Sequence, residues 1–211
     1  MRVQKTHNFN NWLSGTYLSN DTSDIGYIII PKNASSYMRD LVEETFGWTT
    51  EFNYNDNPKQ KYIVVLRDPY ERWITGVAEY FHLNHRNLSI DNDGLLHFMC
   101  QRVVFDVHTE EQRNFIQGIN LKNITFFKLN ENLSSNLRFY VTEKKFHNQL
   151  DLELNFNYFK KNTTIDSDEK VQLVNIIKRF LKNNPKYTHR IKDRYKLDYE
   201  LIKKVKFYGT N

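Results

Sequence analysis

Lys32 and the two serines that follow it have a spacing that could bind an anion. Lys32 lies in a short loop, Pro31 to Ser35, directly after the apolar run Gly26 to Ile30. Ser35 and Ser36 open a stretch whose apolar residues have helical spacing. The N–H groups and the dipole of a helix start attract negative charge, and the lysine adds a formal cation. The loop is therefore predicted to bind a phosphate or sulfate group.

A plainer interpretation of this loop stays open. The nucleotide-triphosphate pattern G-x-x-x-x-G-K-[ST] is absent, since no glycine lies between Gly26 and Gly47. An ordinary strand-to-helix turn with serine caps and a surface lysine would have the same sequence. The first loop alone does not decide between the two interpretations.

Arg67 and Thr75 form a second candidate anion site. Arg67 follows another apolar run, Lys61 to Leu66, and Thr75 lies eight residues after Arg67. Asp68 and Pro69 are typical of a helix start, which places Thr75 about two turns into that helix. A guanidinium binds phosphate through two hydrogen bonds, and a hydroxyl can complete the site. A salt bridge from Arg67 to a neighbouring carboxylate is the alternative, but the presence of both loops together favours anion binding.

The apolar runs alternate with helical patterns, which indicates an α/β protein with a mostly parallel sheet flanked by helices. Ligands of such sheets bind at the carboxyl ends of the strands, where both loops would lie. The predicted strands are 26–30, 61–66 and 124–129, and the predicted helices are 36–46, 69 onward, 94–105, 109–117, 133–140, 167–182 and 197–206.

Length and composition predict one cytoplasmic domain. The 211 residues suit a single domain, 1–211, with a polar lead-in at 1–24 and a basic helical segment at 178–211. The one cysteine, Cys100, excludes an internal disulfide framework and fits a reducing compartment. An apolar run of about 18 residues, as a membrane-spanning helix needs, is absent, and the first residues lack a secretion-signal pattern.

Positive charge is concentrated near the end of the sequence. Residues 178–211 contain 11 Lys and Arg against 3 Asp and Glu, a formal charge of +8, whereas the whole chain carries +5. Such a segment could attract an acidic substrate, a membrane surface or nucleic acid, although a solvated helical face is the simpler interpretation. No zinc-finger spacing or aromatic RNA-binding pattern accompanies the charge, so nucleic acid is a minor hypothesis.

Two segments, Pro31 to Ser36 and Arg67 to Gly76, resemble the sulfotransferases that use 3′-phosphoadenosine 5′-phosphosulfate (PAPS). The likeness is to the carbohydrate sulfotransferase branch, of the sulfotransferase family 2 type. Weaker likenesses are His108 to Gln112, which lacks the Trp and Pro usual inside that motif, and Tyr195 to Ile202. The resemblance implies a P-loop-containing nucleotide-hydrolase-like fold of three layers. It also implies PAPS as donor, adenosine 3′,5′-bisphosphate as product, and no metal.

The resemblance assigns roles to the residues of both loops. The first loop would surround the 5′-phosphosulfate, with Lys32 neutralising charge on the departing phosphate oxygen. Arg67 and Thr75 would bind the 3′-phosphate, with threonine where the family usually has serine. The donor-binding residues implied in this way are Lys32, Asn33, Ala34, Ser35, Ser36, Tyr37, Arg67 and Thr75.

An acceptor hydroxyl also needs a general base. His108 is the first candidate, because it matches the family motif and histidine titrates near neutral pH. Glu79 and His82 are the other two, because they share a helical face with Thr75. Structural roles remain the alternative for each of these side chains.

The acceptor is predicted to be a carbohydrate or another hydroxyl or amine compound, and the basic segment 178–211 could steer an anionic one. Animal Golgi members of the family carry a membrane anchor that this sequence does not show, which suggests a bacterial or viral cytoplasmic enzyme. Two other functions stay open, a small-molecule kinase of the P-loop type and a non-catalytic module that binds anions or nucleic acid. Acceptor identity, sulfation position and oligomeric state do not follow from the sequence.

Overall fold

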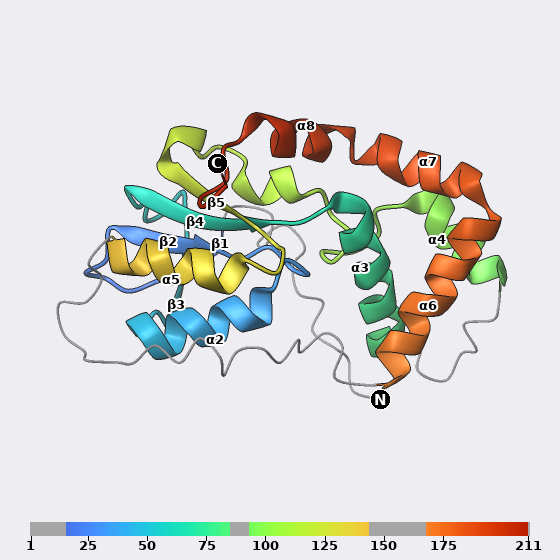
Figure 1. The fold of residues 1–211 in the computed structure, drawn as a ribbon, viewed down its shortest axis with the longest axis horizontal. Coiled ribbons are helices and arrows are strands. Elements are labelled where there is room, and N and C mark those ends of the chain that lie inside the picture. The colour runs from blue at the N-terminus through green and yellow to red at the C-terminus, as the bar shows by residue number, and fades with distance from the viewer. Residues whose placement is uncertain (1–15, 85–92, 144–167, 211) are drawn as a thin grey trace.

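The computed structural model describes residues 16–84, 93–143 and 168–210, which form an α/β protein around one five-stranded sheet (Figure 1). The strand order is β3-β1-β2-β4-β5. β4 pairs in parallel with β2 on one side and with β5 on the other, whereas β1 pairs antiparallel with both β2 and β3. The strands are β1 (Thr16–Ser19), β2 (Ile25–Ile28), β3 (Thr50–Asn53), β4 (Lys61–Leu66) and β5 (Ile124–Lys128).

Helical segments cover both faces of this sheet. Along β4, Ile63 and Val65 face one side and Tyr62, Val64 and Leu66 the other, as the period of a strand requires. The first face packs against helices α2 (Ser35–Phe46) and α5 (Leu133–Glu143). The second packs against the 3₁₀ helix η1 (Gln112–Ile116) and against α8 (Lys196–Lys204). A second short 3₁₀ helix, η2 (Leu121–Asn123), leads into β5.

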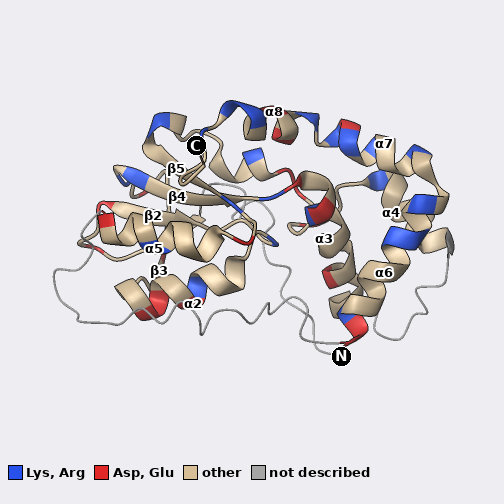
Figure 2. Cartoon of the chain, in the orientation of Figure 1, with Lys and Arg blue, Asp and Glu red and all other residues tan. Residues whose placement is uncertain are grey.

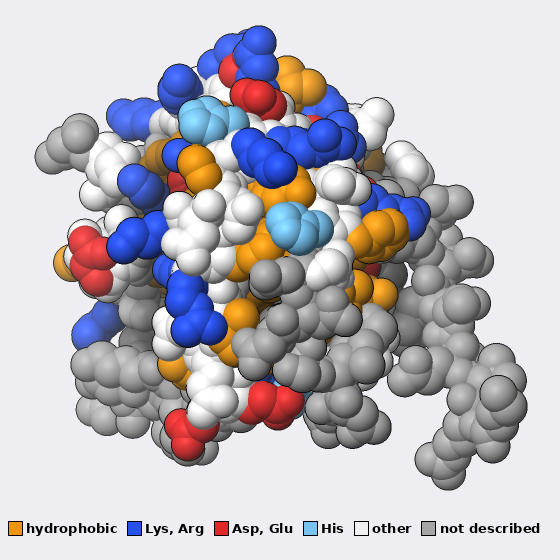
Figure 3. All heavy atoms as spheres, turned by 90° about the vertical axis from the view of Figure 1, so that its right-hand side faces the viewer, with side chains coloured by type: hydrophobic (Ala, Val, Ile, Leu, Met, Phe, Trp, Pro, Cys, Tyr) orange, Lys and Arg blue, Asp and Glu red, His pale blue; other side chains and the backbone are white. Residues whose placement is uncertain are grey.

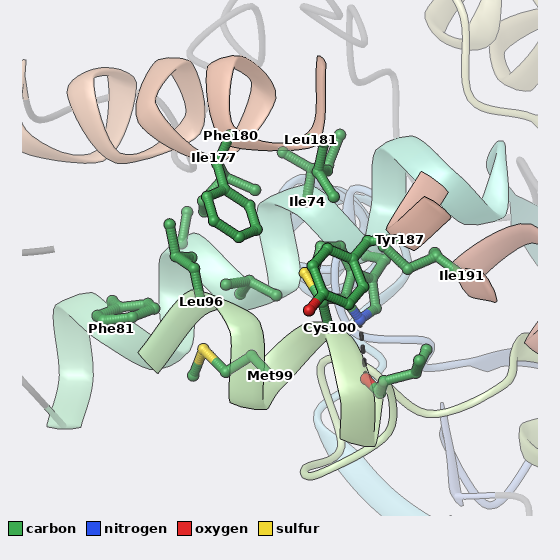
Figure 4. Close-up of a cluster of buried hydrophobic side chains, with 14 of the residues drawn as sticks. Ile74, Phe81, Leu96, Met99, Cys100, Ile177, Phe180, Leu181, Tyr187 and Ile191 are labelled. Atoms are coloured by element: carbon green, nitrogen blue, oxygen red, sulfur yellow. Dashed lines mark hydrogen bonds between the residues drawn. The ribbon is translucent and has the colours of Figure 1, made fainter. Parts of the chain in front are cut away.

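Four further helices form a separate hydrophobic cluster beside the sheet (Figure 1). They are α3 (Pro69–Asn84), α4 (Asp93–Arg102), α6 (Asp168–Asn183) and α7 (Pro185–Arg194). Figure 4 shows Ile177, Phe180 and Leu181 of α6 beside Leu96 and Cys100 of α4. Because α3 follows β4 directly, this cluster fixes the helix that carries Thr75 against the end of the sheet. Within the described residues, no helix has both the length and the apolar character needed to span a membrane.

The predicted strands at 26–30, 61–66 and 124–129 and the helices at 36–46, 69 onward and 133–140 are confirmed within a few residues. The prediction of a mostly parallel sheet is wrong, because β1 and β3 add two antiparallel pairings and make the sheet mixed. β1 lies inside the expected polar lead-in 1–24, of which residues 1–15 lie outside the described residues. The sequence analysis also missed α7.

Two predicted helices differ from the observed ones. The helix expected at 94–105 ends at Arg102, where Val103 adopts a left-handed backbone with φ 60°. The helix expected at 109–117 is only a 3₁₀ turn at 112–116. Its start is set by Asp198 of α8, whose carboxylate accepts hydrogen bonds from the N–H groups of Gln112 (2.8 Å) and Arg113 (2.9 Å). A tertiary contact therefore decides where the helical turn of this segment begins.

Candidate functional site

The loop between β2 and α2 has an unusual backbone. Lys32 and Ala34 have left-handed φ values of 68° and 59°, a conformation that is costly for residues other than glycine. Ala34 is the N-cap residue of α2, and no side chain caps the helix there. The first helical hydrogen bond runs from the N–H of Met38 to the carbonyl of Ala34 (2.9 Å). The N–H groups of the helix residues before Met38 therefore precede the regular hydrogen-bond pattern of the helix. Such alternation of left-handed residues ahead of a helix forms a concave group of N–H donors suited to an anion.

The remaining residues of this loop point in different directions. Ser35 is half-buried and Ser36 is exposed at the start of α2. Tyr37 donates a hydrogen bond from its hydroxyl to Ser134 of α5 (3.0 Å), and burial raises its pKa. The Tyr37 hydroxyl is therefore engaged in packing α2 against α5.

Asn33 is fully buried and ties the loop to its neighbours. Its Nδ2 donates to the carbonyl of Val65 in β4 (2.8 Å) and to Oε1 of Gln112 (2.6 Å). The same Gln112 oxygen accepts the N–H of Arg67 (3.0 Å), and Gln112 Nε2 donates to the Arg67 carbonyl (2.9 Å). One glutamine side chain thus holds both candidate anion loops in a fixed relation to each other.

Arg67 and Thr75, the predicted second anion site, contact each other directly. Arg67 Nη1 donates to Thr75 Oγ1 (3.0 Å) and to the main-chain carbonyl of Lys32 (3.2 Å). Burial lowers the pKa of Arg67, but an arginine stays charged at any ordinary pH. Glu71, a neighbouring carboxylate that could have formed a local salt bridge with Arg67, pairs instead with Lys178 of α6 (3.0 Å). The ends of β2 and β4 therefore bring the two loops side by side.

Arg72, to which the sequence analysis assigned no role, supports the first anion loop. Its side chain is 1% exposed and donates from Nε to the Pro31 carbonyl (2.9 Å). Its two terminal nitrogens donate to the carbonyls of Glu110 and of Val107, the latter at 3.3 Å. The guanidinium thereby joins helix α3, the first anion loop and the segment that precedes η1.

Lys32 and Glu79 form an ion pair of 3.0 Å between Nζ and Oε2, and both side chains are largely buried. Burial lowers the pKa of Lys32, and Glu79 opposes that shift. Burial would raise the pKa of Glu79, but Lys32 and Lys170 outweigh it and bring the pKa to about 2. His82 lies one turn beyond Glu79 and pairs with Glu169 of α6 (3.2 Å) rather than with the anion loops. Glu79 is thus part of the site, whereas His82 lies at its edge.

His108 lies against α3 through its main chain. Gly76 has no Cβ, and one added there would lie 2.5 Å from the His108 carbonyl oxygen, so only glycine permits this approach. The imidazole Nδ1 lies 2.8 Å from Oδ2 of Asp106, and the side chain is 23% exposed. A carboxylate at Nδ1 favours the tautomer in which Nε2 can accept a proton. Among the described residues, no hydrogen bond joins the His108 ring to Lys32 or Arg67.

Replacing Gln112 with leucine tests its role as the link between the two loops. The change removes one of the two partners of Asn33 Nδ2 and both side-chain partners of the Arg67 main chain, so the free energy of unfolding is expected to fall by about 2 kcal/mol. Chemical denaturation measures this change. Gln117→Leu, at an exposed position just after η1, is the matched control and is expected to leave stability within about 0.5 kcal/mol of the wild type. Equal effects of both changes would contradict the linking role.

The basic residues of 178–211 lie on α6, α7 and α8, except Lys206, which follows α8, and they run along one border of the molecule (Figure 2). Figure 3 views the molecule from that side and shows lysine and arginine side chains gathered at its upper part. Two of these residues are paired, Lys178 with Glu71 and Arg194 with Glu111 (both 3.0 Å). Most of the others are exposed, as expected of a solvated helical face.

The sequence analysis assigned no role to four residues that shape the site: Arg72, Asp106, Gln112 and Lys170. Gln112 and Asp106 are close to His108 in sequence, and a carboxylate two residues before a histidine was a signal available to sequence reasoning. Lys170 and Arg72 carried no such signal, since their partners lie far away in sequence.

Compared with protein-family models, with curated proteins and with solved structures, the chain has no match in any of the three.

Proposed function

We propose that this protein is a sulfotransferase that moves a sulfuryl group from PAPS to a hydroxyl or amine of an acceptor, with a carbohydrate as the favoured acceptor class. The observation that carries the proposal is the contact of Arg67 Nη1 with both Thr75 Oγ1 and the Lys32 carbonyl. It places the two candidate anion loops next to each other, as the binding of one nucleotide with phosphates at its 3′ and 5′ positions would require. We further propose that the β2–loop–α2 unit and the parallel strands β2, β4 and β5 belong to a P-loop-like fold.

The residues of the two loops fit such a donor. The left-handed backbone at Lys32 and Ala34 supports a role for the loop N–H groups and the Lys32 ammonium at the 5′ end. Arg67 and Thr75 offer a guanidinium and a hydroxyl for the 3′-phosphate. Asn33 acts differently from the prediction, because its buried amide braces β4 and Gln112 instead of facing a ligand. PAPS supplies an activated sulfuryl group when it is bound.

The proton of the acceptor hydroxyl is proposed to pass to Nε2 of His108, as the new O–S bond forms and the bond from sulfur to the phosphate oxygen breaks. Asp106 supports this role by orienting the imidazole through Nδ1. Glu79 is a poor proton acceptor at neutral pH because its pKa lies near 2. Lys32 balances the charge that develops on the phosphate oxygen.

Calorimetric titration with adenosine 3′,5′-bisphosphate, beside AMP and Mg-ATP, tests the proposal. The bisphosphate is expected to bind, AMP to bind weakly, and Arg67→Ala to weaken bisphosphate binding roughly ten- to hundredfold, because a charge-assisted pair to phosphate is lost. Arg138→Ala, at an exposed position of α5, is the matched control and is expected to bind like the wild type.

The same titration separates the alternatives. Magnesium-dependent binding of ATP without a need for a 3′-phosphate would support a kinase and overturn the proposal. Salt-sensitive binding of DNA or RNA, with no preference for the bisphosphate, would indicate a non-catalytic module. An Arg67→Ala protein that binds the bisphosphate as tightly as the wild type would place the 3′ site elsewhere.

A further inference from the structure

Two lysines from distant parts of the chain share a single carboxylate oxygen at the proposed donor site. Oε2 of Glu79 lies 3.0 Å from Nζ of Lys32 and 3.0 Å from Nζ of Lys170. The three side chains are 14%, 11% and 17% exposed, so the cluster is largely shielded from water. Lys32 comes from the anion loop, Glu79 from the middle of α3 and Lys170 from the first turn of α6. Two ammonium groups are thus held close together beside the loop.

A neighbouring pair shows that this burial is not a general property of the α3–α6 interface. Lys178 lies two turns after Lys170 on α6 and pairs with Glu71, two turns before Glu79 on α3, also at 3.0 Å. Those side chains are 47% and 42% exposed, as is usual for a surface ion pair. The two helices therefore place equivalent Lys–Glu pairs in two settings, one in water and one beside the anion loop.

Like charges are brought together in the shielded cluster at an energetic cost. Lys170 and Arg67 both act to lower the pKa of Lys32, in addition to the effect of burial, and Glu79 opposes them. An anionic group bound between the ammonium groups would relieve this repulsion. Each ammonium carries three N–H donors, so it can bind a carboxylate and an anion at the same time.

We propose that Lys170 is a second cationic ligand for the terminal anionic group of the donor, the sulfuryl end bound beside Lys32, and that Glu79 is the positioning residue that holds both ammonium groups there. The inference rests on the proposed function and adds to it the element α6, which then contacts the donor's terminal sulfuryl group. It predicts that Lys170 distinguishes PAPS from adenosine 3′,5′-bisphosphate, because only PAPS carries the sulfuryl group.

The test compares the affinities of PAPS and of adenosine 3′,5′-bisphosphate by calorimetry for the wild type and three variants. The wild type is expected to bind PAPS about tenfold more tightly than the bisphosphate, and Lys170→Met is expected to abolish most of that preference. Lys170→Arg keeps the charge and is expected to retain part of the preference. Lys178→Met removes the exposed pair of the same two helices and is expected to leave both affinities unchanged.

Three outcomes would overturn the inference alone. They are a wild type with equal affinities for the two ligands, a Lys170→Met protein with the wild-type affinity for both ligands, and one in which both affinities fall by the same factor. The last would mean that Lys170 only stabilises the helix packing. Failure of the wild type to bind either ligand would instead overturn the proposed function itself.

Discussion

Replacement of Lys32 with methionine is expected to lower the rate of sulfuryl transfer by roughly 10²–10³. The ammonium lies beside a loop whose backbone is held in a costly conformation, and its pairing with Glu79 fixes its position before a ligand arrives. A donor group held in advance stabilises developing charge without reorganisation, so its loss affects the transition state more than binding. The expected signature is a large fall in rate with a smaller change in bisphosphate affinity.

The rate is measured as release of adenosine 3′,5′-bisphosphate from PAPS in the presence of a panel of neutral and acidic oligosaccharides. Lys128→Met is the matched control, because Lys128 is an exposed lysine at the end of the neighbouring strand β5. The control is expected to retain the wild-type rate. A Lys32→Met protein with undiminished transfer would show that this lysine has only a structural role.

The largest effect on stability is expected for Arg72→Met, which should lower the free energy of unfolding by about 3–5 kcal/mol. Methionine keeps much of the side-chain volume, but it removes every donor from the buried carbonyls of Pro31, Val107 and Glu110. Each carbonyl left without a partner costs about 1–3 kcal/mol when water cannot reach it. The guanidinium also lies over the Phe115 ring, 5.7 Å from its centre, and that contact is lost as well.

Urea denaturation of the wild type and the variant measures this change. Arg138→Met is a suitable control, since Arg138 is exposed on α5, and its effect is expected to stay within about 0.5 kcal/mol. Equal midpoints for Arg72→Met and the wild type would mean that water or other donors replace the guanidinium, and Arg72 would then not be the residue that fixes the first anion loop to the segment before η1.

The parallel part of the sheet could be predicted from the sequence because its strands are short continuous apolar runs. β4 is buried on both faces, which requires apolar residues at both parities and makes the strand visible in the pattern. β3 has the sequence Thr-Glu-Phe-Asn, with two exposed residues, and apart from the stacking of Phe52 on Tyr17 its pairing with β1 rests on main-chain hydrogen bonds that most sequences can make. Edge strands of this kind carry little signal in their side chains.

Some helices of the second half of the chain likewise could not be predicted from the sequence. α7 buries only Tyr187 and Ile191, so its apolar spacing is too sparse to stand out among its charged residues. The segment at 109–117 has helical spacing, yet it forms only a 3₁₀ turn because Asp198 of α8 caps it at Gln112. A hydrogen-bonding side chain more than eighty residues away thus had more influence on this segment than its local helix preference.

The sequence by itself determined the two loops at the ends of β2 and β4, because a strand, a short loop and a helix start are local patterns and their chemistry resides in adjacent residues. Lys32, Arg67 and Thr75 were predicted as candidate site residues in this way, and in the structure Arg67, at the end of β4, contacts Thr75 of α3. Only the tertiary structure decided that Gln112 links the loops and that Lys170 joins Lys32 on Glu79. Those contacts arise from the packing of α6 against α3 and of η1 against the sheet, and such long-range contacts leave no periodic pattern in the chain.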